Sequence, residues 1–206
     1  MHAPLRLERM MMMRKQQLSR KTGETDIDLQ VTIDGSGQSD IQTGVGFLDH
    51  MLDAFTRHGL FDLTVRCQGD LEVDQHHTVE DVGIVLGQAF RKALGTKEGI
   101  TRYAHITTPM DEALSTVSID ISGRPYLVYH VDGLKDKIGQ FDTELVEEFF
   151  RGFVNHSYMT LHINVAYGKN SHHIVESIFK GFGRALDVAT EINPRIKGIP
   201  STKGLL

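Results

Sequence analysis

The sequence is poor in cysteine, and it has neither a long apolar run nor an excess of positive charge. Its single cysteine, Cys67, among 206 residues excludes an internal disulfide framework and fits a reducing cytoplasm. No apolar run approaches the ~18 residues that a membrane-spanning helix needs. The formal net charge is −5, with 22 basic against 27 acidic residues, which leaves no basic surplus for a polyanion. We therefore expect a cytoplasmic protein that binds neither membranes nor nucleic acid.

Histidine, in contrast, is abundant, and four of the 11 histidines belong to two copies of one motif. The motif His-His-x-x-Glu occupies residues 76–80 and again residues 172–176. On a helix, at about 100° per residue, its three polar side chains project from one side, while the two adjacent imidazoles diverge too far to share one ion. Imidazole and carboxylate groups are ligands of divalent metals. Each doublet is therefore expected to serve two metal ions.

The two motifs belong to a longer internal repeat. Alternating apolar residues predict a half-buried strand over 24–35, and a similar run stands at 117–121,. Apolar residues at helical spacing predict four helices, which begin near Val45, Val79, Leu145 and Val175 and match in pairs at offsets of 98 and 96 residues,. Strands at 63–67 and 161–165 also match. The sequence thus indicates a duplicated α/β unit that buries one face of each helix against its sheet.

We divide the chain accordingly. Residues 1–17 are interpreted as a flexible N-terminal extension without the apolar core of a signal peptide,. Residues 18–206 are expected to form a single domain of two repeats, about 18–98 and 103–192, followed by a turn-rich tail at 193–206.

The duplication yields eight candidate metal ligands, because His50 and Glu148 stand at matching points on the preceding helices. If the eight ligands divide into two sets of four, each set leaves two open positions on its own six-coordinate ion, as a catalytic site requires. Five imidazoles and three carboxylates suit Mn²⁺, Fe²⁺ or Zn²⁺, and we favour Mn²⁺. Asp49 and Asp81, each next to a ligand, are candidates to orient these ligands or are solvated acids. The eight candidates are His50, His76, His77, Glu80, Glu148, His172, His173 and Glu176.

Several runs of residues closely resemble the imidazoleglycerol-phosphate dehydratases of histidine biosynthesis. They are GVGFLDHML (44–52), DQHHTVEDVGI (74–84), ISGRPY (121–126), NSHHIVESIFKGFGRAL (170–186) and PSTKG (200–204). The resemblance implies an α+β fold, an internally duplicated ribosomal protein S5 domain 2-like unit in which two four-stranded sheets sandwich four helices. It also implies a lyase that dehydrates D-erythro-imidazole glycerol phosphate to imidazole acetol phosphate with two Mn²⁺ ions per active site.

The resemblance assigns roles to individual residues. Seven of the eight ligands match the family, while Glu148 stands where most members have histidine. We expect Glu24, His77 and His173 to take part in catalysis. Glu24 is also expected to contact the substrate, together with a phosphate-binding set consisting of Arg102, Arg124, Ser201, Thr202 and Lys203. The family assembles as a homo-oligomer of twenty-four subunits, with active sites at subunit contacts.

Two other functions remain open from the residues. A dinuclear metallohydrolase could use the same ligands to hold a bridging hydroxide, and it would turn over esters or amides. A metal-assembled storage or structural protein would use the ions only to join its subunits. Turnover with trace metal would separate an enzyme from the latter.

Overall fold

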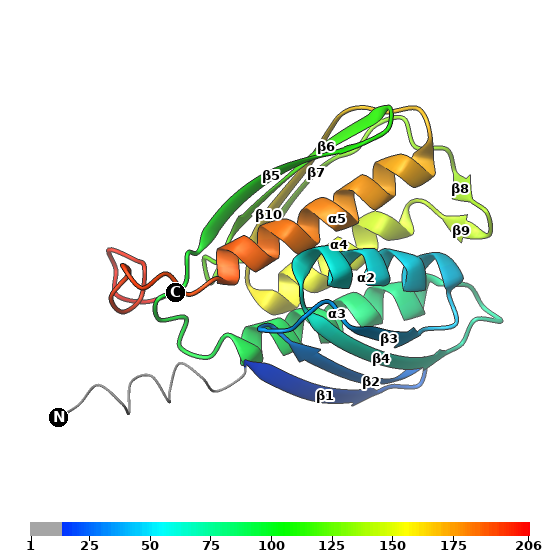
Figure 1. Cartoon of the computed structure of the whole chain (residues 1–206). Helices are drawn as coiled ribbons and strands as arrows, with labels where there is room; N and C mark the ends of the chain where they lie inside the picture. Colours follow the sequence, from blue (N-terminus) through cyan, green and yellow to red (C-terminus); the bar gives the residue numbers. More distant parts are fainter. Residues whose placement is uncertain (1–13) are drawn as a thin grey trace.

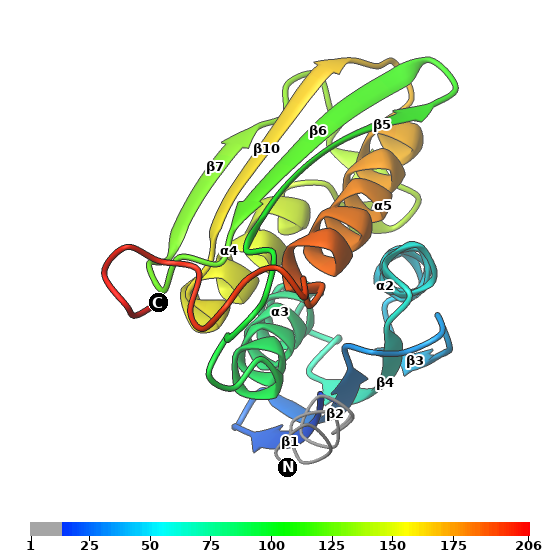
Figure 2. The same ribbon diagram turned by 60° about the vertical axis from the view of Figure 1, so that its left-hand side comes forward.

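A layer of four helices lies between two four-stranded sheets (Figure 1 and Figure 2) in residues 14–206, the part of the chain that the computed structural model describes. The first sheet has the order β1 (Lys15–Lys21), β2 (Thr25–Thr32), β4 (Asp62–Gly69), β3 (Ser39–Gln42). The second sheet has the order β5 (Tyr103–Met110), β6 (Ala113–Asp120), β10 (Thr160–Tyr167), β7 (Tyr126–His130). The helices are α2 (Gly46–Gly59), α3 (His76–Ala93), α4 (Leu145–Ser157) and α5 (Ser171–Thr190).

The two sheets have the same topology. In each, the central strands are antiparallel, with Leu29 opposite Val65 in the first sheet and Val117 opposite Ile163 in the second. The short strands β3 and β7 both run parallel to their neighbours. A small hairpin, β8 (Lys137–Ile138) with β9 (Phe141–Asp142), follows β7. The predicted α+β class with two four-stranded sheets and four helices is therefore confirmed.

The helices pack in two pairs, α2 with α5 and α3 with α4, and glycine allows each pair to approach closely. A Cβ added to Gly183 would lie 2.4 Å from the carbonyl oxygen of Phe55, and one added to Gly87 would lie 2.4 Å from that of Phe153. The two contacts are related by the internal repeat. Only a residue without a Cβ permits this approach of backbone to backbone.

One aromatic cluster joins the two repeats. The ring of Phe182 on α5 lies 5.0 Å from the rings of Phe55 and Phe153 and 5.2 Å from that of Phe150. Phe55 comes from the first repeat, while the other three belong to the second. The buried apolar residues of both repeats form one continuous core. Folding therefore fixes the relative positions of the helix ends that carry the histidine doublets.

The structure corrects the expected start of the domain. Residues 15–17, assigned to the extension, form the beginning of β1, where Lys15 pairs with Thr32 and Gln17 with Gln30. β1 is an edge strand whose side chains are polar except for Leu18, so it lacks the apolar alternation of a central strand. The rest of the predicted extension, residues 1–13, lies outside the described residues. No helix between residues 14 and 206 is long and apolar enough to cross a membrane.

Candidate metal centre

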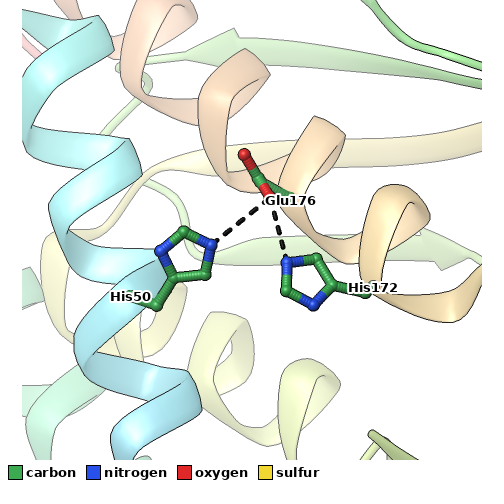
Figure 3. Close-up of side chains that lie close together, drawn as sticks. All are labelled: His50, His172 and Glu176. Carbon is green, nitrogen blue, oxygen red and sulfur yellow. Dashed lines mark hydrogen bonds and ion pairs between the residues drawn. The ribbon is translucent and has the colours of Figure 1, made fainter.

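Three of the predicted ligands converge where α2 and α5 begin. Figure 3 shows His50 of α2 facing His172 and Glu176 of α5. The Oε2 atom of Glu176 lies 3.0 Å from Nε2 of His172 and 3.4 Å from Nε2 of His50. One donor atom from each residue lies within 4.8 Å of the other two. Two imidazoles and a carboxylate at this spacing fit a divalent metal ion of the Mn²⁺, Fe²⁺ or Zn²⁺ type.

Local structure holds these side chains in place. The side chain of Asn170 caps α5 by accepting a 2.9 Å hydrogen bond from the backbone nitrogen of His172,. Glu176 follows His172 at the fourth position along α5, which places both side chains on one face of the helix,. The loop before α2 is fixed by Asp49, whose carboxylate accepts hydrogen bonds from the backbone nitrogen and the hydroxyl group of Thr43.

Glu176 is a buried anion, with 7% of its surface exposed. Burial opposes its ionisation, but the hydrogen bond and charge of Lys180, with Nζ at 2.6 Å, outweigh burial and lower the pKa of Glu176. His50 and His172 contribute in the same direction. The centre thus presents a carboxylate that stays ionised near neutral pH, as a metal ligand must.

The repeat-related set on α3 and α4 is less compact. Nε2 of His76 lies 3.6 Å from Oε2 of Glu80, while Glu148 of α4 contacts Arg151, with Nε at 3.5 Å from its carboxylate. Across residues 14–206, the group on α2 and α5 is the only set of three or more donors at the required spacing. A second carboxylate replaces an imidazole in the α3–α4 set, and the guanidinium of Arg151 neutralises part of that charge.

The second histidine of each doublet is turned toward its own carboxylate. Nδ1 of His77 donates to Asp70 at 3.0 Å, and Nδ1 of His173 donates to Glu112 at 2.8 Å. These hydrogen bonds raise the pKa of both histidines, and the contact with His173 lowers the pKa of Glu112 to about 2. A carboxylate on Nδ1 fixes the tautomer that presents Nε2 to a metal. Nε2 of His77 lies 3.6 Å from Glu24.

A hollow of about 470 Å³ opens beside the second doublet. His172, His173 and Glu112 form one side of it, and Lys135 and Lys137 reach it from the segment that contains β8. Its volume lies within the range of pockets that hold small ligands. His172 of the metal centre therefore borders a hollow that also carries basic side chains.

A family model described as imidazoleglycerol-phosphate dehydratase matches residues 43–186. An imidazoleglycerol-phosphate dehydratase of Oceanobacillus iheyensis is 63% identical over 194 residues, which are 94% of this chain and all of that protein. One from Acetivibrio thermocellus is 60% identical over 193 residues, 94% of this chain and 99% of that protein. The chain belongs to the imidazoleglycerol-phosphate dehydratase family.

Solved structures of the family agree with this fold. The crystal structure of imidazoleglycerol-phosphate dehydratase from Staphylococcus aureus superposes with a TM-score of 0.79 at 44% identity, covering 87% of this chain and 99% of that one. The enzyme from Pyrococcus furiosus, crystallised in complex with (S)-C348, gives a TM-score of 0.79 at 40% identity over 92% and 100% of the two chains.

The predicted phosphate-binding residues gather at the other end of α5. Arg102 donates to Asp120 at 2.8 Å and, through Nη1, to the carbonyl oxygen of Pro200 at 2.8 Å. Arg124 lies beside the same aspartate at 3.9 Å. The tail that carries Ser201, Thr202 and Lys203 ends against Gly123, so these family positions are neighbours. Figure 1 shows the C-terminus and the β8–β9 hairpin at opposite ends of α5.

Asp49 and Asp81, considered as residues that orient the ligands or as solvated acids, bond to residues other than the ligands. Asp49 accepts hydrogen bonds from Thr43 in the loop before α2, and Asp81 is buried in an ion pair with Arg20. Adjacent residues of a helix point about 100° apart, so a neighbour in sequence faces away from the ligand. The carboxylates that bond to the second histidines are Asp70, shortly before α3, and Glu112, in the turn between β5 and β6. In the sequence, only Asp70 lies close to its histidine doublet, so no signal marked Glu112.

Proposed function

We propose that the chain catalyses the dehydration of imidazole glycerol phosphate to imidazole acetol phosphate in histidine biosynthesis, in the cytoplasm. The observation that carries the proposal is the convergence of His50, His172 and Glu176 in a chain of the imidazoleglycerol-phosphate dehydratase family. The reaction removes a hydroxyl group and a proton from neighbouring carbon atoms. It therefore needs a site that binds the ring, activates the hydroxyl group and accepts the proton.

We assign two Mn²⁺ ions to each active site. His50, His172 and Glu176 would hold one ion, and the repeat-related residues His76, Glu80 and Glu148 would hold the other. When bound, such an ion supplies Lewis acidity that stabilises negative charge on the substrate. His77 and His173 are the remaining ligands of the predicted set, and each presents its Nε2 away from the carboxylate on Nδ1.

The separation of the two predicted subsites supports active sites shared between subunits. The backbone nitrogen of Arg102 donates a hydrogen bond to the carbonyl oxygen of Ala189 on α5. Ala189 lies 17 residues after His172, a separation of about 25 Å along the helix. Imidazole glycerol phosphate, whose ring and phosphate are joined by a three-carbon chain, cannot span this distance. The phosphate set of one copy must therefore meet the metal ligands of another copy, in line with a homo-oligomer of twenty-four subunits.

Proton transfer is assigned to Glu24, which lies beside His77. His77 and His173, each held by a carboxylate at Nδ1, are assigned to the catalytic site with it. Glu24 is exposed beside Nε2 of His77, and Asp70 holds the opposite side of that ring. A carboxylate in this position can accept a proton from a substrate carbon and return it to the product. Glu24→Gln removes the basic oxygen but keeps the shape, so turnover should fall by about 100-fold or more.

The test uses metal-stripped protein, synthetic imidazole glycerol phosphate and detection of the ketone product, with Mn²⁺ added back or withheld. Product should form only with the metal, and His50→Ala should abolish it while His58→Ala, on the same helix, should not. No product from metal-loaded, assembled protein would refute the proposal.

Hydrolysis of esters or amides would favour the dinuclear hydrolase, and metal-dependent assembly without turnover would favour the storage or structural protein. Light scattering with and without chelator should show a smaller particle after metal removal.

A further inference from the structure

Glu24, to which proton transfer is assigned, lies in the turn between β1 and β2. Its side chain is 55% exposed, and Oε1 lies 3.6 Å from Nε2 of His77, which is too far for a hydrogen bond. The position of this carboxylate is therefore set by the backbone that carries it. Within the turn, the hydroxyl group of Thr22 accepts hydrogen bonds from the backbone nitrogens of Glu24 and Thr25.

A buried polar network ties this turn to helix α3, which lies next to β1 and β2 (Figure 2). Asp81 on α3 is 5% exposed, and Thr25 at the start of β2 is 3% exposed. The hydroxyl group of Thr25 donates a 2.5 Å hydrogen bond to Oδ2 of Asp81, and Arg20 of β1 donates to the same oxygen. Burial of a carboxylate is costly unless it is paired and hydrogen-bonded. The network therefore binds the end of β1 and the beginning of β2 to one point on α3.

The two residues of α3 that face this turn are one helical turn apart. Asp81 follows His77 by four positions, so both side chains lie on one face of the helix,. Asp81 bonds to Thr25, and His77 lies beside Glu24, the residue that precedes Thr25. The buried contact is thus adjacent in the chain to the exposed carboxylate, and a shift of Thr25 would move Glu24 relative to His77.

The second repeat folds without this network. Ala113 stands at the position of Thr25, at the offset of 88 residues, and Ser177 stands at the position of Asp81, at the offset of 96. Alanine has no hydroxyl group to donate, and the hydroxyl group of Ser177 bonds to the carbonyl oxygen of Ile174 in its own helix. The duplicated unit therefore does not need the network in order to fold.

The glutamates at equivalent positions of the two repeats are held in different ways. Glu112, 88 residues after Glu24, accepts a 2.8 Å hydrogen bond from Nδ1 of His173. Glu24 lies beyond hydrogen-bond distance of His77. The glutamate that makes its own hydrogen bond has no network behind it, and the glutamate without one has the network.

We propose that Thr25, Asp81 and Arg20 are positioning residues, which hold the β1–β2 turn so that the carboxylate of Glu24 stays in place for proton transfer. None of the three touches the reacting atoms, and each acts through Glu24. The proposal rests on the proposed function, because it concerns the residue to which that function assigns proton transfer. Reaction rates are sensitive to such placement, since a shift of about 1 Å can cost about 100-fold.

Thr25→Val tests the proposal, because it removes the hydroxyl group and keeps the shape of the side chain. In metal-loaded protein, kcat should fall by about 10- to 100-fold. Thr25→Ser, which keeps the hydroxyl group, should retain most of the wild-type kcat. Thr108→Val is the matched control, because Thr108 is a buried threonine at the position of Arg20 in the second repeat, and it should leave kcat unchanged. Thermal unfolding checks that each variant is folded.

Combining Thr25→Val with Glu24→Gln separates positioning from a merely structural effect. If the network acts through Glu24, the double variant should turn over no more slowly than Glu24→Gln alone. Multiplied losses in the double variant would overturn the proposal, as would a wild-type kcat in Thr25→Val or an equal loss in Thr108→Val.

Hydrogen exchange of the segment 20–26, followed by mass spectrometry, reports on the turn without any need for turnover. Exchange should be about tenfold faster in Thr25→Val than in the wild type, in Thr25→Ser or in Thr108→Val. Unchanged exchange in Thr25→Val would overturn the proposal. A wild-type protein without turnover would refute the dehydratase reaction, whereas faster exchange in Thr25→Val would still show that the network holds the turn.

Discussion

Replacing Gly183 by alanine should disturb the metal centre from a distance, through the packing of two helices. The new Cβ would lie 2.4 Å from the carbonyl oxygen of Phe55, whereas ordinary contacts begin near 3.4 Å. Helices α2 and α5 would therefore have to separate locally by about 1 Å, five times the ~0.2 Å tolerance of a metal–ligand distance. Because His50 stands on one helix and Glu176 on the other, we expect metal affinity to fall by about 10- to 100-fold.

The same substitution should lower the free energy of unfolding. Overpacking costs about 1–3 kcal/mol, and the better helix propensity of alanine returns at most ~1 kcal/mol. Urea denaturation measures the stability, and calorimetric titration with Mn²⁺ measures the affinity. Gly46→Ala is the control within α2, because its Cβ meets nothing within 4 Å. Wild-type metal affinity and stability in Gly183→Ala would refute the coupling of helix spacing to the metal centre.

Three further predictions follow from the core and from the two histidine–carboxylate pairs. Phe182→Ala should cost about 3–5 kcal/mol in urea denaturation, because the ring contacts helices of both repeats,, and a loss below 1 kcal/mol would contradict its central position. Asp70→Asn should lower the pKa of His77, which an NMR titration of the metal-stripped protein can follow; an unchanged pKa would exclude Asp70 as the cause. The pair of Glu112 and His173 should stabilise the metal-stripped fold most between pH 4.5 and 6.5. The lowered pKa of Glu112, about 2 against an ordinary 4.5, makes its contribution disappear in acid, and the raised pKa of His173, ordinarily 6.5, makes that contribution disappear in base. Thermal unfolding of wild type and Glu112→Gln should thus differ most in that window, and a pH-independent difference would refute the assignment.

The sequence was sufficient to predict the central elements of the fold but not its edges. Apolar and polar residues alternate over 26–31 of β2 and 116–120 of β6, because one face is buried and the other is more exposed. β1 has only one apolar side chain on its inner face, Leu18, and β3 is four residues long. β1 is stabilised by hairpin pairing with the next strand, β2, and β3 by pairing with β4 beyond helix α2. Backbone pairing of this kind leaves no apolar periodicity in the strand itself.

The candidate site, too, could be predicted only in part from the sequence. Helical spacing alone predicts that His172 and Glu176 share a face, because they are four residues apart. The approach of His50 depends on the packing of α2 against α5, which only the repeat and the family resemblance could suggest. The pairing of His173 with Glu112 joins residues 61 positions apart. No local pattern marks Glu112, since its role depends on how the β5–β6 turn lies against the start of α5.

The internal repeat places two sets of candidate ligands, one on α2 and α5 and one on α3 and α4, at equivalent positions but with different charge. His50, His172 and Glu176 bring one carboxylate, and Lys180 bonds to it. The α3–α4 set brings two, because Glu148 stands where His50 stands in the other repeat. An added carboxylate favours harder cations and reduces the Lewis acidity of the ion that it binds. In the proposed reaction, an ion held by the set on α2 and α5 would therefore be the stronger Lewis acid.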